Sequence, residues 1–364
     1  MFDRIAILGF GLIGSSLARA LRERAPSMHI AAFDTSAATL ETAVKTGIAQ
    51  SQHAHAGQAA QGAQLVIIAS PPASFGTLAA DIAPFLAEGA IVTDTGSVKR
   101  HAITAITPSL PKHVHFVPGH PIAGSEQRGI AAGRADLFAG KRMLLTPQEA
   151  QLKSDAVTEV RKFWELAGAR VEFMPAELHD RIYAYVSHLP QLVAFACDQP
   201  MKDLPAPADE TQQRFTRLMK SDPTLWAEIC LANADYVGEA IDDFSSFASQ
   251  MAGELSETPA AGGADAAQVA VLFPRVVATC LIATASLLQE ITGVHPARYA
   301  GSGFADMTAP ALSDPEAALS AISSHHWVIA KKLKSMLAHL QEAQKQMSYS
   351  SKEQLVTALK AAYS

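Results

Sequence analysis

The chain has 364 residues, of which 49% are hydrophobic and 18% are charged, and this length predicts a large buried core divided between two domains. Its formal net charge of -6 at pH 7 and the lack of any Lys/Arg cluster argue against a nucleic-acid-binding surface. Three widely spaced cysteines disfavour a disulfide framework or a thiolate metal site and fit a reducing cytoplasm. We expect no metal site, signal peptide or membrane span, because the first strand begins almost at once and polar residues interrupt the apolar helices.

The N-terminal segment carries a dinucleotide-binding pattern. Residues from Arg4 to Leu8 predict a buried strand, followed by a glycine-rich turn and a helix from Ser15 to Arg24. In such a turn the first glycine allows the tight bend, the second lets the backbone approach a pyrophosphate, and the third lets the helix pack on the strand. The N–H groups at the start of the helix favour phosphate. The predicted cofactor-binding residues of the turn are Gly9, Phe10, Gly11, Leu12, Ile13 and Gly14.

A second predicted strand, from His29 to Phe33, ends at Asp34, and 34 − 14 places this carboxylate 20 residues after Gly14. In a dinucleotide-binding fold, the acidic residue at this position binds the two ribose hydroxyls, and its carboxylate repels a 2′-phosphate. Asp34 therefore favours NAD over NADP as the cofactor. The alternative is a turn residue at the strand end or a helix N-cap.

Three further apolar segments, 64–69, 90–93 and 115–117, alternate with helical segments and predict a parallel sheet. Ligands of such sheets bind beyond the carboxyl ends of the strands. We therefore expect the residues that follow these strands to face one crevice: Ser70, Pro71, Thr95, Ser97 and His120. Two simpler interpretations stay open, since Ser97 could only cap the helix that begins near Val98, and Lys99 could be a solvated charge in its first turn.

His120 stands between Gly119 and Pro121, shortly after the predicted strand 115–117. A neutral imidazole is the side chain best suited to accept an alcohol proton near pH 7, and the flanking Gly and Pro residues restrict the backbone. Beside a nicotinamide, His120 would serve as the general base of an alcohol oxidation. The alternative is an ordinary loop histidine.

The alternation of strands and helices ends with segment 169–173, and the chain beyond Pro175 is predicted to be helical. We expect an α/β Rossmann-type nucleotide-binding domain at residues 1–174, followed by an all-α domain at 175–364. The Pro-rich stretch 200–209 and the small-residue stretch 256–266 are predicted to be loops between helices.

The helical half contains an internal similarity. Ser221-Asp222-Pro223 recurs as Ser313-Asp314-Pro315, an offset of 92 (313 − 221), and Leu189-Pro190 resembles Phe273-Pro274 at an offset of 84 (273 − 189). These matches suggest a duplicated helical unit with copies at 175–255 and 267–345. Similarity of this weak kind can also arise among helices by chance.

Several motifs occur in the order and approximate spacing of one known family. They are the glycine turn with Ser15-Ser16, Asp94-Thr95-Gly96-Ser97-Val98-Lys99, Gly119-His120-Pro121-Ile122-Ala123-Gly124-Ser125-Glu126, Asp136-Leu137-Phe138, His179-Asp180 and Ser187-His188-Leu189-Pro190. On these residues the chain resembles the prephenate and arogenate dehydrogenases of tyrosine biosynthesis, which implies a fold like that of 6-phosphogluconate dehydrogenase. The motifs at 119–126 and 187–190 are much more specific than the glycine turn.

The resemblance implies oxidative decarboxylation of prephenate to 4-hydroxyphenylpyruvate with reduction of NAD. His120 would accept the proton of the ring hydroxyl, and Ser97 would orient the imidazole or the hydroxyl. Arg217 matches the family's arginine, where a guanidinium could clamp a carboxylate, and a surface salt bridge is the alternative. The other substrate-binding residues that the resemblance implies are Ser187, His188, Gln191, Trp226 and Gly303. A buried structural histidine at 188 and a core tryptophan at 226 are the alternatives for those two positions.

The resemblance also bears on assembly. In the family the helical domains of two subunits intertwine, and a glycine-rich loop from one subunit reaches the site of the other. We therefore expect either a homodimer or a pseudo-dimeric monomer. In the second case the segment around Gly303 stands in for the partner subunit.

Three other functions stay open. Many prephenate-using members have a histidine where this chain has Gln191, and a neutral amide would better tolerate the ammonium group of arogenate, so arogenate or dual use is the first alternative. The second is another hydroxyacid or imine dehydrogenase of the superfamily, although the predicted helix 175–197 lacks the lysine expected there. The third, a non-catalytic NAD-binding sensor, would not need His120, Ser97 and Arg217.

Overall fold

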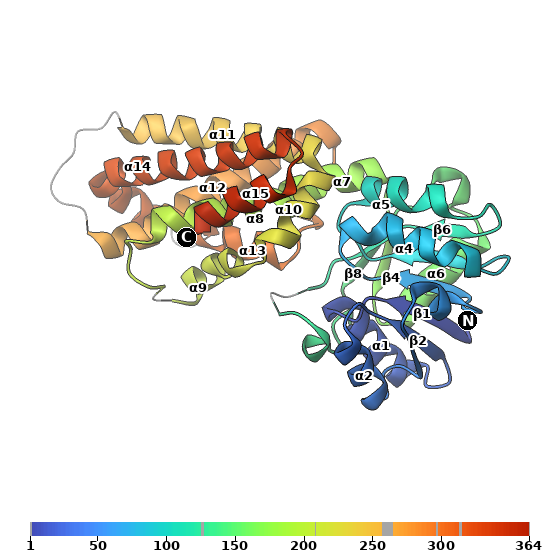
Figure 1. Ribbon diagram of the computed structural model, residues 1–364. Coiled ribbons are helices and arrows are strands. Elements are labelled where there is room, and N and C mark those ends of the chain that lie inside the picture. The colour runs from blue at the N-terminus through green and yellow to red at the C-terminus, as the bar shows by residue number, and fades with distance from the viewer. Residues whose placement is uncertain are drawn as a thin grey trace. The chain divides into compact units, whose positions relative to one another are not determined.

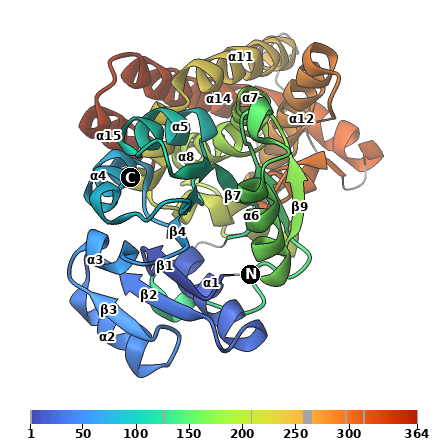
Figure 2. The same ribbon diagram turned by 90° about the vertical axis from the view of Figure 1, so that its right-hand side faces the viewer.

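The computed structural model describes residues 2–124, 127–207, 209–256, 265–295, 298–312 and 315–363. The chain divides into two compact units, Met1–Asp180 and Arg181–Ser364, which are drawn in Figures 1 and 2. This division lies a few residues beyond the boundary that the sequence predicts after residue 174. The helix that contains the division, α7 (Ala176–Tyr183), contributes His179 and Asp180 to the first unit.

The first unit is built on a six-stranded parallel sheet with the order β3-β2-β1-β4-β5-β6, as Figure 2 shows for its first strands. Its strands are β1 (Arg4–Leu8), β2 (His29–Phe33), β3 (Ser51–His53), β4 (Leu65–Ile68), β5 (Ile91–Asp94) and β6 (His115–Val117). The parallel sheet of a Rossmann-type fold is thereby confirmed. The sequence reasoning missed β3, whose three polar residues carry no apolar pattern.

Helices cover both faces of this sheet. They are α1 (Leu12–Arg24), α2 (Ala37–Lys45), α3 (Ala56–Ala60), α4 (Phe75–Ile82), α5 (Lys99–Ile106) and α6 (Asp155–Leu166). Because successive side chains of a strand point to opposite faces, Ile5 and Ile7 enter a core with α1 and α6, whereas Ala6 and Leu8 enter a second core with α3, α4 and α5. Burial on both faces explains the continuous apolar runs of the central strands.

A second, three-stranded sheet contains the predicted base. It has the order β7-β8-β9, with β7 (Gly119–Pro121), β8 (Arg142–Leu145) and β9 (Arg170–Phe173). His120 lies in β7 opposite Leu144 of the antiparallel neighbour, so the alternative of an ordinary loop histidine is wrong. Gly and Pro are poor strand residues, and a partner strand far along the sequence leaves no local signal.

Every element that the structure describes in the second unit is helical, and the long helices α11, α12 and α14 pack side by side (Figure 1). The helices are α8 (Leu189–Met201), α9 (Glu210–Arg217), α10 (Pro223–Ala232), α11 (Ala234–Ser256), α12 (Ala266–Thr292), α13 (Ser302–Thr308), α14 (Pro315–Ser348) and α15 (Lys352–Tyr363). Pro200 lies inside α8, so the loop predicted from that residue begins later. Among the described residues α12 is the one helix long and apolar enough to cross a membrane, but 61% of its apolar stretch is buried inside the protein, as in a core helix.

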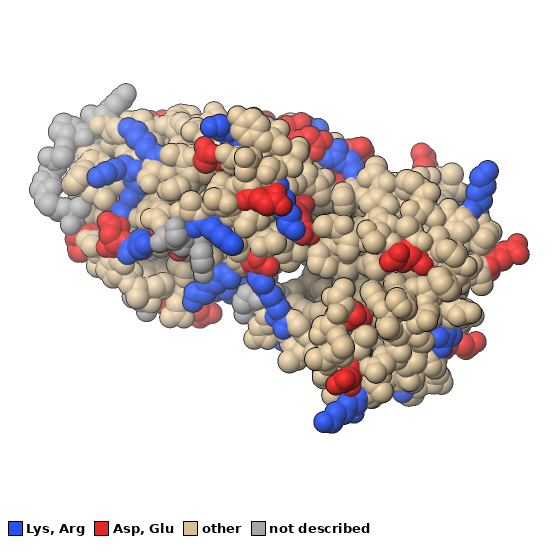
Figure 3. All heavy atoms as spheres, viewed as in Figure 1, with Lys and Arg blue, Asp and Glu red and all other residues tan. Residues whose placement is uncertain are grey.

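Charged side chains of both signs are interspersed on the face shown in Figure 3. This mixture accords with the modest net charge of -6.

Candidate functional site

The glycine turn after β1 has the geometry that a dinucleotide needs. Gly9 has a φ of 104°, which an L side chain rarely adopts. A Cβ on Gly14 would overlap the carbonyl oxygen of Gly9, whereas a Cβ on Gly11 would meet nothing within 4 Å. The three glycines therefore provide a tight bend, an open approach and a close helix contact, as the sequence predicts.

The turn leads into α1, whose N-cap is Gly11 and has no side-chain cap. Free N–H groups at this end suit a phosphate. Strands β1 and β4 are neighbours at the point where the strand order reverses, which is where such sheets bind ligands. Phe10 is fully buried, while Leu12 and Ile13 are partly exposed.

Three of the predicted crevice residues follow β4 and β5. Ser70 accepts a hydrogen bond from the Ser74 hydroxyl at 2.7 Å, Pro71 is exposed, and the Thr95 N–H donates to the Ile68 carbonyl at 3.1 Å. They lie at the carboxyl ends of adjacent parallel strands, so they share the sheet edge that the sequence assigns to them.

Asp34 closes the glycine turn. Its two carboxylate oxygens accept the N–H groups of Phe10 at 2.7 Å and Ser36 at 2.9 Å. The N-cap of α2 is Ser36, whose side chain accepts from the Thr39 N–H, so Asp34 is not the cap. Each carboxylate oxygen has a second lone pair for a ribose hydroxyl.

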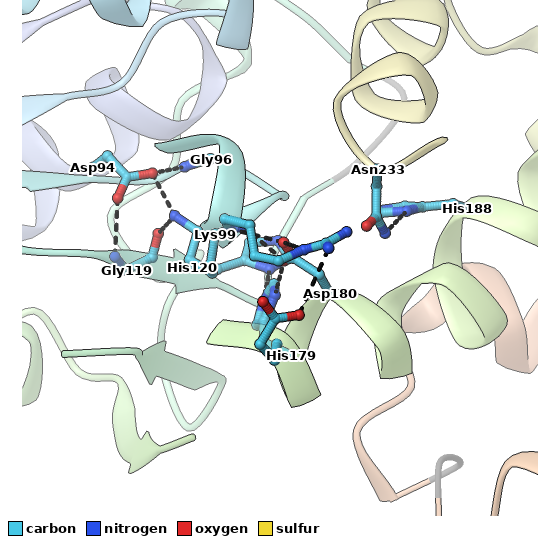
Figure 4. Close-up of polar contacts among 11 residues, drawn as sticks. Asp94, Gly96, Lys99, Gly119, His120, His179, Asp180, His188 and Asn233 are labelled. Atoms are coloured by element: carbon cyan, nitrogen blue, oxygen red, sulfur yellow. Dashed lines mark hydrogen bonds and ion pairs between the residues drawn. The ribbon is translucent and has the colours of Figure 1, made fainter. Parts of the chain in front are cut away.

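Lys99 is not a solvated charge, so the simpler interpretation that the sequence leaves open for this residue is wrong. Its side chain is 0% exposed and forms an ion pair with Asp94, and its Nζ also donates to the Gly119 carbonyl (Figure 4). Burial lowers the pKa of Lys99, while the Asp94 carboxylate acts against that shift. Asp94 also accepts the Gly119 N–H at 3.0 Å, so the pair fixes the residue that precedes His120.

Asp180, rather than Ser97, caps helix α5. Its carboxylate accepts the N–H of Lys99 at 2.7 Å and the N–H of Arg100 at 2.8 Å. The N-cap position is Val98, without a side-chain cap, so capping as the sole role of Ser97 is excluded. Ser97 is partly exposed just before the helix.

His120 heads a chain of three side chains (Figure 4). Its Nδ1 lies 2.9 Å from Nε2 of His179, and Nδ1 of His179 lies 2.8 Å from Oδ1 of Asp180. His179 is fully buried and His120 partly exposed. The last two residues of the motif around His120, Ser125 and Glu126, lie outside the described residues.

Protonation along this chain follows from the hydrogen bonds. Burial by itself would raise the pKa of Asp180, but hydrogen bonds from His179 and from the backbone hold it below the ordinary value, so an ionised carboxylate accepts from Nδ1–H of His179. Burial lowers the pKa of His179, so its Nε2 is an acceptor and Nδ1 of His120 donates to it. When the His120 ring is neutral, its proton therefore lies on Nδ1 and its Nε2 can accept a proton, as a general base must.

In the helical unit, His188 lies at the end of a π-helical segment, Ala184–His188, a distortion that is frequent at functional sites. Its Nδ1 is 3.2 Å from the Asn233 amide (Figure 4), and its ring packs edge-on against Trp226 at 6.3 Å. Ser187 and Trp226 are partly exposed, so Trp226 is not a core tryptophan. His188 is fully buried.

Arg217 ends α9 and pairs with a carboxylate of the protein itself. Its Nε and Nη2 donate to Oδ2 of Asp306 at 2.9 and 2.7 Å, and Arg214 Nε donates to Oδ1 at 2.9 Å. The Asp306 side chain is 9% exposed. Arg217 therefore forms a salt bridge, as in the alternative that the sequence leaves open, but with a largely buried partner that orients the guanidinium.

Gln191 and Gly303 both approach the turn that follows Arg217. Gln191 is 1% exposed; its Nε2 donates to the Leu218 carbonyl at 2.7 Å and its Oε1 accepts from the Ser221 hydroxyl at 3.2 Å. Gly303 lies in helix α13 rather than in a loop, and a Cβ there would touch the Leu218 side chain. This geometry gives Gln191 a positioning role in place of the substrate contact that the sequence suggests.

The sequence reasoning did not assign roles to Asp94, His179, Asp180 and Asp306. Asp94 and the pair His179-Asp180 belong to motifs that carry the family resemblance, so the signal was available. Asp306 lies in the segment around Gly303, but its pairing had no signal, because its arginine partners lie about 90 residues earlier in the chain. The described residues contain no group of His, Cys, Asp and Glu that could hold a metal ion.

Two family models match most of the chain. The model described as "Prephenate dehydrogenase, nucleotide-binding domain" matches residues 17–173. The model described as "Prephenate dehydrogenase, dimerization domain" matches two segments, residues 175–261 and 265–361. Together they confirm the order of an α/β nucleotide-binding domain followed by a helical domain.

Individual proteins agree with the models. A cyclohexadienyl dehydrogenase from Zymomonas mobilis is 34% identical over 252 residues, which are 67% of this chain and 85% of that protein. A prephenate dehydrogenase from Bacillus subtilis is 29% identical over 67% of this chain and 68% of that protein. The crystal structure of prephenate dehydrogenase from A. aeolicus, in complex with hydroxyphenyl propionate and NAD+, matches at a TM-score of 0.62 and 33% identity over 68% of this chain and 88% of that one. The chain thus belongs to the prephenate dehydrogenase family.

Proposed function

We propose that this chain catalyses the NAD-dependent oxidative decarboxylation of prephenate to 4-hydroxyphenylpyruvate, a step of tyrosine biosynthesis in the cytoplasm. The observation that carries the proposal is the chain of hydrogen bonds from Asp180 through His179 to His120. In the neutral form of His120 it leaves Nε2 unprotonated, which suits alcohol oxidation and which a non-catalytic sensor would not need. Membership of the family supports the choice of substrate.

The residues of the glycine turn fit NAD. Gly11 and the N-terminus of α1 would bind the pyrophosphate, and Asp34 would accept hydrogen bonds from the ribose hydroxyls. Ser70, Pro71 and Thr95 would line the same edge of the sheet. When bound, NAD supplies the acceptor for the hydride that leaves the carbinol carbon of the substrate. The bound NAD+ of the A. aeolicus enzyme supports this assignment.

His120 would act on the substrate hydroxyl. Its Nε2 accepts the hydroxyl proton while the carbinol C–H bond breaks, and Ser97 orients the imidazole or the hydroxyl. The bond to the ring carboxylate then breaks, carbon dioxide leaves, and its electron pair moves through the ring to the new carbonyl oxygen. That oxygen takes the proton back from His120, and the aromatic ring that forms supplies the driving force. A general base of this kind contributes about 10²–10⁴ in rate.

Within the helical unit we assign substrate binding to Arg217, with His188, Ser187 and Trp226. A guanidinium can bind a carboxylate through two parallel N–H···O hydrogen bonds, and Arg217 is the arginine that matches the family's. Gln191 supports the backbone turn that follows Arg217 through its hydrogen bond to the Leu218 carbonyl, and Gly303 leaves space for the Leu218 side chain, which a Cβ there would touch.

Use of arogenate, alone or beside prephenate, is the second candidate. It is favoured by the similarity to the cyclohexadienyl dehydrogenase from Zymomonas mobilis. The neutral amide of Gln191 no longer argues for arogenate, because it is buried and bonded to Leu218 and Ser221.

Side-by-side kinetics test this assignment. We expect prephenate and NAD to give NADH and 4-hydroxyphenylpyruvate in equal amounts, with a lower kcat/KM for NADP and for arogenate. A higher kcat/KM with arogenate would transfer the assignment to the second candidate. Oxidation of neither compound would refute the proposal.

A further inference from the structure

The helical unit consists of two halves in which several helix boundaries recur at one offset, with the single helix α14 corresponding to both α10 and α11. Helices α9 and α13 begin at Glu210 and Ser302, and α10 and α14 begin at Pro223 and Pro315. Helices α11 and α14 end at Ser256 and Ser348. All three pairs are 92 residues apart, the offset of the Ser-Asp-Pro repeat, whose second Ser and Asp, 313 and 314, lie outside the described residues. We call residues 181–256 the first module and residues 265–348 the second module.

The two modules pack against each other reciprocally. Helix α11 of the first module packs along α14, its counterpart in the second. Helix α8 of the first module contacts α14, and α12, the counterpart of α8, contacts α11. Helix α9 contacts its own counterpart α13. Such reciprocal contacts between equivalent elements are the hallmark of a two-fold symmetric interface.

Side chains join the modules at the substrate residues assigned above. Asp306 of the second module holds Arg214 and Arg217 of the first, and Gly303 of the second module faces Leu218 of the first. Elsewhere, the Tyr183 hydroxyl donates to the Tyr299 carbonyl at 3.0 Å. The second module therefore orients the arginine that the first module offers to the substrate.

We propose that the helical unit is an internal dimer, in which the second module occupies, within one chain, the place of a second subunit's dimerization domain. The dimerization-domain model matches residues 175–261 and residues 265–361, which supports this proposal. The regions shared with relatives cover about two thirds of this chain, and the length of the remaining third supports the proposal as well. The site is then complete in a monomer, and Asp306 is the residue by which the second module positions Arg217. The role of Asp306 rests on the function proposed for Arg217, whereas the internal dimer does not.

Mass and dilution test the internal dimer. Light scattering on the full chain is expected to give a monomer of 38.5 kDa at every concentration, with a turnover number that does not change on dilution. A stable dimer, or a turnover number that falls on dilution, would overturn the internal dimer. The mass measurement needs no substrate, so its result stands even if prephenate is not oxidised.

Substitution of Asp306 tests its positioning role. We expect Asp306→Asn to raise the KM for prephenate roughly tenfold, the effect of about 1.4 kcal/mol, with kcat changed less than about twofold and the NAD affinity unchanged. The matched control is Glu239→Gln, which removes an exposed partner of Arg181 in the same unit and should leave all three values unchanged. An unaltered KM in a folded Asp306→Asn variant would contradict the positioning role. A fall in melting temperature without a KM change would show that the carboxylate is only structural.

Discussion

At the residue scale, one carboxylate sets the proton positions on two histidines. Asp180 accepts from His179, and His179 accepts in turn from His120. The same carboxylate also accepts hydrogen bonds from two backbone N–H groups at the start of α5. Asp180 therefore links the fold of the first unit to the protonation state of its base.

Replacement of Asp180 should separate chemistry from cofactor binding. In Asp180→Asn the new amide can donate to His179, which reverses both tautomers and places a proton on Nε2 of His120. We expect kcat to fall by about 10²–10⁴, the contribution of a general base, and the free energy of unfolding to fall by about 1–3 kcal/mol. Steady-state kinetics and urea unfolding measure the two effects.

Glu177→Gln is the matched control, because Glu177 lies on the same helix and its exposed side chain meets Arg100 at 3.6 Å. Exposed ion pairs contribute little to stability, so this variant should keep wild-type kcat. If Asp180→Asn also kept wild-type kcat, the deduced tautomers would be wrong.

The sequence predicts the role of a residue only where that residue belongs to a recognisable motif. His120 and the glycine turn stand in local motifs, and their expected places at the strand ends follow from parallel topology. The sequence cannot reveal the partners of Gln191 and Arg217, because Leu218 and Asp306 lie far from them along the chain.

At the scale of elements, apolar patterns predicted the buried strands well, because both faces of a parallel sheet are covered. The predicted strand His29–Phe33 has the observed bounds. Strands β3 and β7 carry no apolar pattern, since three residues with polar, Gly or Pro side chains form a strand only through their neighbours. Strand β8 is not among the predicted strands either, although its residues Met143, Leu144 and Leu145 are apolar and buried. The loop predicted to begin at Pro200 begins later for a related reason, because a proline near a helix end is tolerated when tertiary packing holds the turn.

The contact between β1 and α1 gives a prediction with an internal control. Gly14→Ala places a Cβ on the Gly9 carbonyl, and we expect a loss of about 1–3 kcal/mol, as for other overpacked sites. Gly11→Ala has space for its Cβ and a φ of -67°, so it should unfold like wild type yet bind NAD more weakly. Thermal unfolding and NAD titration check both variants, and equal stability losses would contradict the distinct roles of these glycines.

At the scale of the whole molecule, the sequence already contained the division of the chain. The change from strand–helix alternation to continuous helices predicts two units, and the repeated Ser-Asp-Pro motif suggests the two modules that we propose for the second unit. What the sequence could not supply is the pairing of those halves, α11 with α14 and α9 with α13, because helix amphipathicity shows that a face is buried but not against which partner.

The central claim is that His120 is the base of a prephenate oxidation. The most direct measurement is NADH formation from prephenate and NAD by wild type and by His120→Asn, with NAD affinity determined for both. We predict that wild type forms NADH and 4-hydroxyphenylpyruvate, and that His120→Asn loses about 10²–10⁴ in kcat while its NAD affinity stays within about twofold, since the glycine turn and Asp34 are untouched. Full turnover by His120→Asn would contradict the claim.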